Sequence, residues 1–489
     1  TAVPFFLWHY ASIGRDMQSA RGFFEMLVPV YSSQRPNSNS ALSLALAALG
    51  SDILSRWRHR TDSFRSPRRS YARAVSCLRR TIQDRTERSK PATVFAVLTL
   101  QLYENMAAVY GLRAATCIHQ NGAASLLPFA DVGDNINGTL HEYVRKFMLH
   151  TETAAAMRQK RPLRAVAYSW IGSKDLMVAP DNPSSVLDTI GVCVAELQAR
   201  YFRLSTQDDF PPSSHRALRE LRAEAKFIDE QLLAWAQNVP HHWNPARLES
   251  GRDTDSSIPT YQSICDVYPS CPIANLWNLW SFQRFLLVKI TLGSLNTILS
   301  QGPLGSAEDR IFSSEIEELI NCKQTIQEVV DSVCFSVPFY LGNRTKPAGI
   351  TDFTDPEIQL PSYHRLPSDV ECGAGNQVSV FKIYRDEHRS HVIAQDPWHA
   401  MSPLSRLLTL LSEDHHGQPI ASFLRPGQHE WIRAHFLRVT TLLRLPSARP
   451  NDYKKVGGTW NWSAERPDTG AEYLARGTGD VLTEGCRCR

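Results

Sequence analysis

The apolar residues of this chain recur at intervals of three and four, and this spacing restricts its fold more than any other feature of the sequence. Val186, Ile190, Val194, Leu197 and Tyr201 are a clear example. Residues at this spacing share one face of an α-helix, whereas a half-buried strand alternates apolar and polar residues. Such stripes return along most of the chain, and strand-like alternation is rare. The sequence therefore predicts an all-α protein, a multi-helix array of packed antiparallel helix pairs.

Polar stretches interrupt the helical pattern and suggest how the chain is organised. Residues 1–446 are predicted to form one helical domain. Three stretches within it, 207–214, 244–257 and about 343–395, are predicted to be surface loops or disordered, the third being rich in Pro, Asp, Ser and Gly. Periodicity is lost from 447 to 489, which predicts a disordered tail or an unreliable part of the sequence.

Composition bounds the class of protein but does not name a partner. With 43% hydrophobic and 21% charged residues, the 489-residue chain can bury a core. Its net charge of +4 is a small difference between 53 basic and 49 acidic side chains, which does not indicate nucleic acid. No segment reaches the roughly 20 apolar residues needed to cross a bilayer, so we expect a soluble protein without a membrane partner.

The cysteines and histidines do not predict a metal site. None of the ten cysteines lies in a C-x2-C pair, and most stand singly in apolar helical patterns, which favours a reducing, intracellular compartment. His429 and His435 are similar to the pair of a zinc-protease helix, but they are six residues apart instead of four. They are therefore predicted to belong to a solvated helix face. We expect no metal ion and no cofactor bound by this chain itself.

The sequence also lacks the common catalytic motifs. It contains no G-x-S-x-G elbow, no P-loop and no dinucleotide-binding glycine motif. An arginine-rich segment runs from Arg56 to Arg88, but acidic residues dilute it, so the solvent face of an amphipathic helix is favoured over a nucleic-acid contact. The sequence thus predicts no catalytic residues and no enzyme.

Four short motifs, in order along the chain, carry a resemblance to a known family. The first comprises residues 102–104 and 119–127, the second 233–240 with Trp243, the third 276–285 and the fourth 333–342. Together they resemble the regulatory domain of fungal zinc-cluster transcription factors, the second of the two broad fungal-specific families. The resemblance covers roughly residues 5–445. The motif positions with candidate roles are Tyr103, Glu104, His119, Gly122, Ala123, Trp277, Asn278, Trp280, Arg284, Cys334, Pro338 and Gly342.

The resemblance implies a regulator of RNA polymerase II transcription that acts in the nucleus. Coregulator proteins and a small-molecule effector are the partners it implies. The family reads DNA through six cysteines in an N-terminal zinc cluster, and nothing in this sequence matches that module. DNA and zinc are therefore expected only through a module upstream of Thr1. The third motif also departs from the family at Ser281, where an arginine is often found.

The residues of the first motif look like packing devices. Gly122 and Ala123 are expected to permit the close approach of a neighbouring helix. His119 lies one turn earlier and is expected to hydrogen-bond across that contact.

The third motif combines large aromatic residues with one cation. Trp277 and Trp280 are three residues apart and are expected on one buried face, with Asn278 bonded to nearby backbone. Arg284 needs a partner if it is buried, and Glu104 is a candidate. An effector pocket among Trp277, Trp280, Arg284 and His119 is a further hypothesis.

In the fourth motif, Cys334 and Pro338 are expected to end a helix, and Gly342 is expected to turn the chain away. Two other functions stay open on the sequence alone. One is a helical adaptor or corepressor that does not bind DNA directly, and the other is an all-α enzyme of secondary metabolism whose active-site residues converge only in space.

Overall fold

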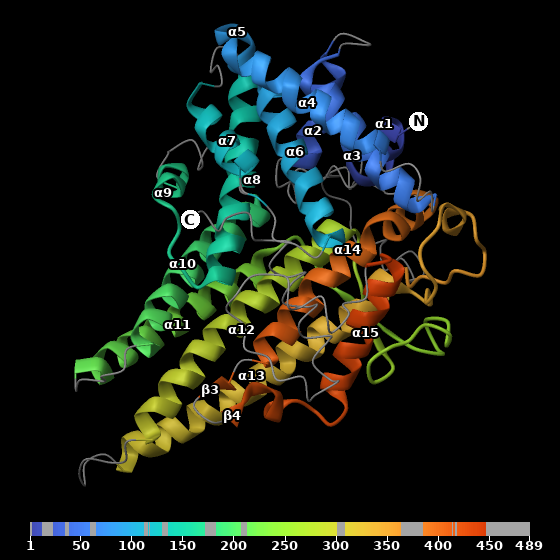
Figure 1. Cartoon of the computed structure of the whole chain (residues 1–489). Helices are drawn as coiled ribbons and strands as arrows, with labels where there is room; N and C mark the ends of the chain where they lie inside the picture. Colours follow the sequence, from blue (N-terminus) through green and yellow to red (C-terminus); the bar gives the residue numbers. More distant parts are fainter. Residues whose placement is uncertain are drawn as a thin grey trace, which may run out of the picture.

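Helices make up nearly all the regular structure of this chain, as the computed structural model shows (Figure 1). This confirms the predicted all-α class. The structure describes residues 2–11, 23–34, 39–58, 65–111, 116, 118–129, 135–171, 182–206, 213–300, 309–362, 385–412, 414–415 and 418–445. The predicted tail at 447–489 lies outside the described residues.

The N-terminal group of helices occupies one end of the molecule (blue and teal in Figure 1). Within it, α3 packs against α1, α4 and α6, and α7 packs against α6. Its elements are α1 (Ala2–Phe6), the π-helix η1 (Leu7–Ala11), α2 (Phe23–Ser32), α3 (Ala41–Trp57), α4 (Arg65–Gln83), α5 (Arg85–Arg88), α6 (Pro91–Tyr110), α7 (Ile118–Leu126), the short 3-10 helix η3 (Leu127–Phe129), α8 (Asn135–Gln159) and α9 (Ala165–Ile171).

The C-terminal group contains the longest helices (green to red in Figure 1), and α12 and α13 run side by side in opposite directions. Neighbouring pairs α10 and α11, α11 and α12, and α14 and α15 also pack together. Its helices are α10 (Pro183–Ser205), α11 (Ser213–Asn238), α12 (Cys271–Ser300), α13 (Asp309–Leu341), α14 (Arg385–Leu411) and α15 (Gln428–Leu442), with the 3-10 helices η5 (His241–Trp243), η6 (Ile350–Phe353) and η8 (Ile420–Phe423).

Two small antiparallel ribbons interrupt the helices. Strand β1 (Ala246–Glu249) pairs with β2 (Ile264–Val267), and β3 (Asp414–His415) pairs with β4 (Gln418–Pro419). Strand β1 corrects the expectation of a loop or disorder at 246–249, whereas residues 250–257 form turns, as expected of a surface loop. The sequence does not show a clear alternation of apolar and polar residues here, because the charged residue Asp266 is buried in β2. The Arg247 guanidinium donates to the two carboxylate oxygens of Asp266 at 2.9 and 3.0 Å.

Helix α6 forms the centre of the N-terminal group. It begins at Pro91, which lacks a backbone N–H, but no hydrogen bond is lost because the N–H groups of the first turn have no partner within a helix. Apolar residues cover most of its circumference. By length and composition α6 would qualify to cross a bilayer, contrary to the expectation that no segment does. In this structure 67% of the apolar window is buried inside the protein, as in a core helix.

The predicted loop at about 343–395 is only partly irregular. Residues 343–362 form an ordered connection with buried side chains, residues 363–384 lie outside the described part, and α14 already begins at Arg385. The prediction is therefore wrong for 385–395. The polar residues His388 and His391 are buried on α14. This part of the chain therefore has a polar sequence but forms a helix that packs against the core.

The two groups of helices meet where the start of the chain contacts α14. The side-chain amide of Gln395 on α14 donates hydrogen bonds to the backbone oxygens of His9 (3.1 Å) and Tyr10 (3.0 Å) on η1. The Ser390 hydroxyl lies 3.0 Å from His9 Nδ1. One hydrophobic cluster extends from Phe6 to Leu445, so the seam between the groups is part of the core.

Candidate functional site

The first motif positions aromatic rings between three helices. Tyr103 on α6 stacks on Tyr71 of α4, with ring centroids 4.8 Å apart. The Tyr71 hydroxyl lies 3.1 Å from Nε2 of His119 on α7, so His119 does bond across a helix contact. Burial lowers the pKa of His119, against the opposing charge of Glu104. The ring is thus a neutral packing group at physiological pH.

The glycine of the first motif does not have the role expected from its sequence. A Cβ placed on Gly122 would meet only Val97 Cγ1 at 3.7 Å, which is ordinary van der Waals contact. The side chain of its neighbour Ala123 is completely buried. Gly122 thus faces Val97 of α6, but the space there would accept a methyl group, so the close approach does not require glycine.

The two tryptophans of the third motif share a face of α12, as expected. Their rings meet edge to face at a centroid distance of 5.4 Å. The Trp277 indole N–H donates to the backbone oxygen of Trp243 and that of Trp280 to the backbone oxygen of Leu232, each at 2.8 Å. Both indoles thereby tie α12 to α11 and the segment that follows it. They are anchors of the scaffold, with their polar atoms already satisfied.

Arg284 is paired, but not with Glu104. Its Nε and Nη2 donate to the two carboxylate oxygens of Asp229 on α11, at 2.7 and 3.2 Å, and its guanidinium lies 5.0 Å from the centre of the Trp280 ring. Glu104 lies on α6, in the other group of helices. The sequence separates Arg284 from Asp229 by 55 residues, so periodicity alone does not show the pairing.

An Asp229→Ala substitution is expected to lower the free energy of unfolding by about 2 kcal/mol, because it leaves the largely buried Arg284 guanidinium without its carboxylate. Glu104→Ala serves as the matched control and is expected to cost less than about 1 kcal/mol. Urea unfolding followed by circular dichroism measures both. Equal losses for the two variants would contradict the assignment of Asp229 as the partner.

Asn278 joins α12 to α13 through side chains, whereas bonding to backbone had been expected. Its Nδ2 donates to the Tyr340 hydroxyl at 2.9 Å, and its Oδ1 accepts from the Ser336 hydroxyl at 3.2 Å. The Tyr340 hydroxyl in turn donates to the side-chain oxygen Oδ1 of Asn275 at 3.2 Å. The chain of bonds fixes the register of the two longest helices, because a shift of one residue would break all of them.

The fourth motif ends α13 later than expected. Cys334 and Pro338 both lie inside the helix, which runs to Leu341, and Gly342 then turns the chain with a φ of +55°. The turn at Gly342 is confirmed. Cys334 is fully buried, and burial raises the pKa of its thiol, so the group is an inert packing element at neutral pH.

The hypothetical pocket among the third-motif residues and His119 is not supported by this arrangement. His119 contacts α4, whereas Trp277, Trp280 and Arg284 bond to α11 and the segment after it. None of these four residues lines either of the two cavities described below. The residues that surround a cavity come from other parts of the sequence.

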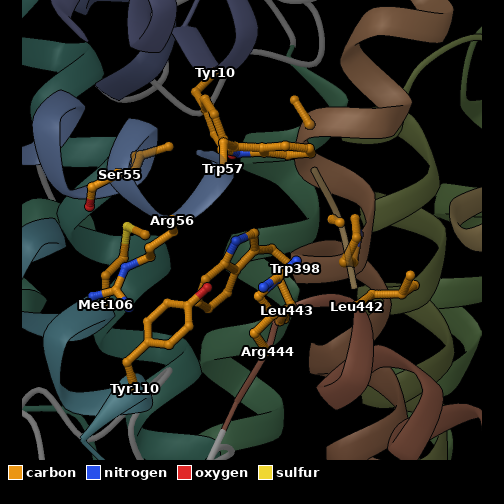
Figure 2. Close-up of a pocket in the computed structure, with 14 residues that line it drawn as sticks. Tyr10, Ser55, Arg56, Trp57, Met106, Tyr110, Trp398, Leu442, Leu443 and Arg444 are labelled. Atoms are coloured by element: carbon orange, nitrogen blue, oxygen red, sulfur yellow. The ribbon is translucent and has the colours of Figure 1, made fainter. Parts of the chain in front are cut away.

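A cavity of about 270 Å³ lies at the seam between the two groups of helices (Figure 2). Figure 2 shows Tyr10 and Trp57 on one side of it and Tyr110 and Trp398 on the opposite side. We call it the seam cavity. It is lined by Tyr10, Ile53, Ser55, Arg56, Trp57, Met106, Tyr110, Ala348, Ala394, Pro397, Trp398, Leu442, Leu443 and Arg444.

The aromatic walls of the seam cavity are held by contacts of their own. The Trp57 indole N–H donates to the Tyr10 hydroxyl at 3.0 Å, which joins α3 to η1. Tyr110 meets Trp398 edge to face with centroids 5.8 Å apart, which joins α6 to α14. The first wall belongs to the N-terminal group, whereas Trp398 belongs to the C-terminal group. The cavity therefore exists only when the two groups are together.

Two arginines give the seam cavity a positive lining. The Arg56 guanidinium stacks over the Tyr110 ring at 3.5 Å, and its Nε donates to Asp52 at 2.8 Å. Arg444 is exposed at the edge of the cavity. Burial raises the pKa of Tyr110 to about 12, so its phenol stays protonated at neutral pH. No Asp or Glu is among the lining residues in the part of the chain that the structure describes.

A second, smaller cavity, with a volume of about 180 Å³, lies between α8 and the helices of the C-terminal group. His150 and Arg406 are among its lining residues. His150 Nδ1 lies 2.7 Å from a carboxylate oxygen of Asp188, and the Arg406 guanidinium covers the Phe282 ring at 4.5 Å. Asn278 is the sequence-predicted site residue that borders this cavity.

The sequence did not point to the seam cavity. Two of its aromatic residues are the last residues of helices, Trp57 of α3 and Tyr110 of α6, and in the sequence they look like ordinary core residues. Arg444 follows the last predicted helix and gave no signal. A tryptophan or tyrosine at the last position of a helix, repeated in separate helices, is the one pattern that would have drawn attention to these residues.

Neither a family model nor a curated protein nor a solved structure matches this chain significantly. The functional interpretation therefore depends on the motifs of the sequence and on the geometry of the sites.

Proposed function

We propose that this chain is the effector-responsive regulatory body of a nuclear transcription regulator, of the fungal zinc-cluster type that its four motifs resemble. The observation that carries the proposal is the seam cavity, which is enclosed by aromatic residues of two separate groups of helices. A small molecule bound there contacts both groups and so changes how firmly they hold together. That is the coupling an effector-responsive regulator needs.

The arrangement of the motif residues supports the same proposal. His119, Trp277, Trp280 and Arg284 all have packing partners within the array. They stabilise a scaffold rather than gather reactive groups. In this proposal the scaffold presents surfaces to coregulator proteins, and DNA is contacted through a zinc-cluster module upstream of Thr1.

Two alternative functions are distinguished by simple observations. A helical adaptor or corepressor without direct DNA binding would be favoured if the genomic sequence upstream of Thr1 encoded no six-cysteine cluster.

An all-α enzyme of secondary metabolism has one supporting feature, the His150–Asp188 pair at the second cavity. Such a pair orients an imidazole as a general base. A turnover that is lost on His150→Gln would establish that function instead.

A reporter assay tests the proposed function directly. The full chain is fused to an unrelated DNA-binding domain and expressed in a fungal nucleus, with the reporter promoter in both a silent and a constitutively active form. We expect transcription to change at least threefold, and Trp398→Ala, which removes a wall of the seam cavity, to shift the response. Arg79→Gln, on an exposed face of α4, is the matched control. Silence on both promoters would refute the proposal.

A further inference from the structure

We infer that helix α4 binds the phosphate backbone of duplex DNA, independently of its sequence, through a row of exposed arginines. The row consists of Arg69, Arg73 and Arg80, and we call it the arginine row. The choice of DNA as the partner rests on the proposed function, because a nuclear transcription regulator works on DNA. Three observations lead to the contact: the geometry of the row, its lack of acidic partners, and the chemistry of the surface around it.

Helix α4 lies on the outside of the N-terminal group (Figure 1). Its buried face, with Ala74 and Leu78, packs against α3 and α6. At about 100° per residue, the three arginines of the row fall within about 40° of one another around the helix axis. At about 1.5 Å per residue, they extend over roughly 16 Å along it. The row is therefore a straight strip of positive charge, held in place by the packed side of the same helix.

The acidic residues of the segment 52–88 do not neutralise the row. The structure describes three of them. Asp52 pairs with Arg56 on α3, Asp84 caps the first turn of α5, and Glu87 pairs with Lys90. Helix α4 itself has six arginines and no acidic residue, and within the described part of the chain no ion pair engages the row. The small net charge of the whole chain thus hides a strongly basic face.

Arginine side chains in a row match the phosphates of a duplex. A guanidinium donates two parallel N–H groups to phosphate oxygens and stays charged at every physiological pH. One DNA strand carries a phosphate about every 3.4 Å along the axis, so a strip of roughly 16 Å spans about five of them. The exposed residues beside the row include Ala72 and Ser76. Because both are small, they do not hold the DNA backbone away from the guanidinium groups.

The surface around the row lacks what other partners require. Protein interfaces have apolar or aromatic anchors at their centre, and a helix that binds a bilayer inserts apolar side chains. Single-stranded nucleic acid is bound by aromatic rings on which its bases stack. Among the described residues of α4, no large hydrophobic side chain is exposed. A polar, strongly positive surface is typical of proteins that contact duplex DNA.

Fluorescence anisotropy of the purified full chain with two labelled DNA duplexes of unrelated sequence tests the inference. We expect affinities that agree within twofold, because the row contacts phosphates and not bases. Between about 50 and 200 mM salt, the slope of log K against log salt should be about −3, since each neutralised phosphate contributes about −0.9. No binding to either duplex at about 50 mM salt, or a strong preference for one sequence, would overturn the inference.

Arg73→Gln measures the row, and Arg79→Gln is its matched control. Both substitutions remove one charge from an exposed position of the same helix, so neither should shift the melting temperature by more than roughly 1 °C. Residue 79 lies about 100° around the axis from residue 80, outside the row. We expect Arg73→Gln to weaken binding at least fivefold at low salt and to reduce the salt slope by about 1. Arg79→Gln should change the affinity less than twofold. Equal losses would mean that overall charge and not the row binds DNA.

Competition identifies the class of partner. Unlabelled duplex DNA, the corresponding single strand, the corresponding RNA duplex and polyglutamate are compared as competitors at equal concentrations of negative charge. We expect duplex DNA to displace the labelled duplex most effectively. More effective displacement by polyglutamate would mean that the row binds an acidic protein segment. More effective displacement by either of the other nucleic acids would likewise overturn the assignment to duplex DNA.

The binding assay and the reporter assay fail independently. If the row binds duplex DNA but the reporter does not respond, the contact is established and the proposed function is wrong. If the reporter responds but the purified chain does not bind either duplex, the proposed function is supported and the DNA contact of α4 is wrong.

Discussion

Gly342→Ala is expected to lower the free energy of unfolding by about 3 kcal/mol or more, because two costs add. Gly342 has a φ of +55°, where a Cβ is strained in any surroundings. A Cβ built at this position would also lie 2.2 Å from the backbone oxygen of Gln359. Backbone cannot rotate away as a flexible side chain can, so the connection 343–362 would have to move.

That connection is bonded too extensively to move freely. Asn343 and Gln359 exchange hydrogen bonds, with the Asn343 N–H donating to the Gln359 oxygen at 3.1 Å and the Gln359 N–H to Asn343 Oδ1 at 2.9 Å. The buried Arg344 donates to the oxygens of Tyr340 and Ile393, and Arg438 on α15 donates to the oxygens of Gly342 and Arg344. A displacement would break contacts among α13, α14 and α15.

Two other glycines supply matched controls for this prediction. Gly251 and Gly427 have φ values of +80° and +77°, and a Cβ at either would meet nothing within 4 Å. Their alanine variants carry the conformational cost alone, about 1 kcal/mol each. Urea unfolding of the three variants separates the terms, and Gly342→Ala should also melt roughly 5 °C lower. A loss no greater than in the controls would mean that the connection yields to the extra methyl group.

Local features of the fold were predictable because neighbouring residues determine them. The helical period follows from the positions of apolar residues, so the all-α class, the burial of α6 and the shared face of Trp277 and Trp280 could be predicted. The turn at Gly342 was equally local, since glycine is the residue that adopts a positive φ without strain.

Helix boundaries were less predictable, because several residues compete to cap a helix. The start of α10 resembles a capping box at Ser185 and Asp188, yet the side chain of Asn182 accepts the Ser184 N–H and begins the helix earlier. In the same helix, Val186 was placed on the buried stripe but is 45% exposed, while Leu187 is fully buried. Helix α10 packs against α8, α11 and α12, so its buried surface is wider than one stripe.

Partners distant in sequence could not be predicted at all. Arg284 was expected to need an acid, which is correct, but the choice of Asp229 over Glu104 depends on how α11 lies against α12. The burial of His435 was missed even though its stacking partner is local: it was expected on a solvated face, yet it is 8% exposed and stacks on Trp431, four residues earlier, at 3.8 Å. The seam cavity combines residues from Tyr10 to Arg444, and only the packing of the whole chain brings them together.

The stability of the protein is expected to fall steeply between pH 6.5 and pH 4, because three histidines are buried in their neutral form. Burial, with a smaller contribution from the nearby His9, lowers the pKa of His391 to about 4, and burial lowers the pKa values of His9 and His435 to about 4. In the unfolded chain each titrates near 6.5. Within this window the unfolded state binds more protons, so the stability present above pH 6.5 is lost progressively as the pH falls to 4.

For the buried His391 and His435, each shift from 6.5 to about 4 corresponds to about 3 kcal/mol when the pH has fallen to 4 or below, whereas the half-buried His9 contributes less because solvent screens its charge. His435→Phe keeps a ring stacked on Trp431 without a titrating nitrogen, so it should reduce the acid-induced loss by that amount. His242→Gln, at an exposed position, is the matched control and should leave the pH profile unchanged. Urea unfolding at half-unit steps from pH 7 to pH 4 measures all three proteins. A wild-type stability that stays constant over this range would contradict the neutral burial of these rings.

The positions of His9 and His391 indicate which part of the protein should open first when the pH falls. His9 lies on η1, next to Tyr10 of the seam cavity, and its ring packs on Phe353 with centroids 4.4 Å apart. His391 lies on α14, one turn before the cavity residue Ala394. Since two imidazolium charges at this contact would repel each other, η1 should separate from α14 before the helical core unfolds. Amide hydrogen exchange at pH 5 should then show η1 exchanging ahead of α12 and α13, whereas simultaneous exchange would mean that the seam opens only with the whole fold.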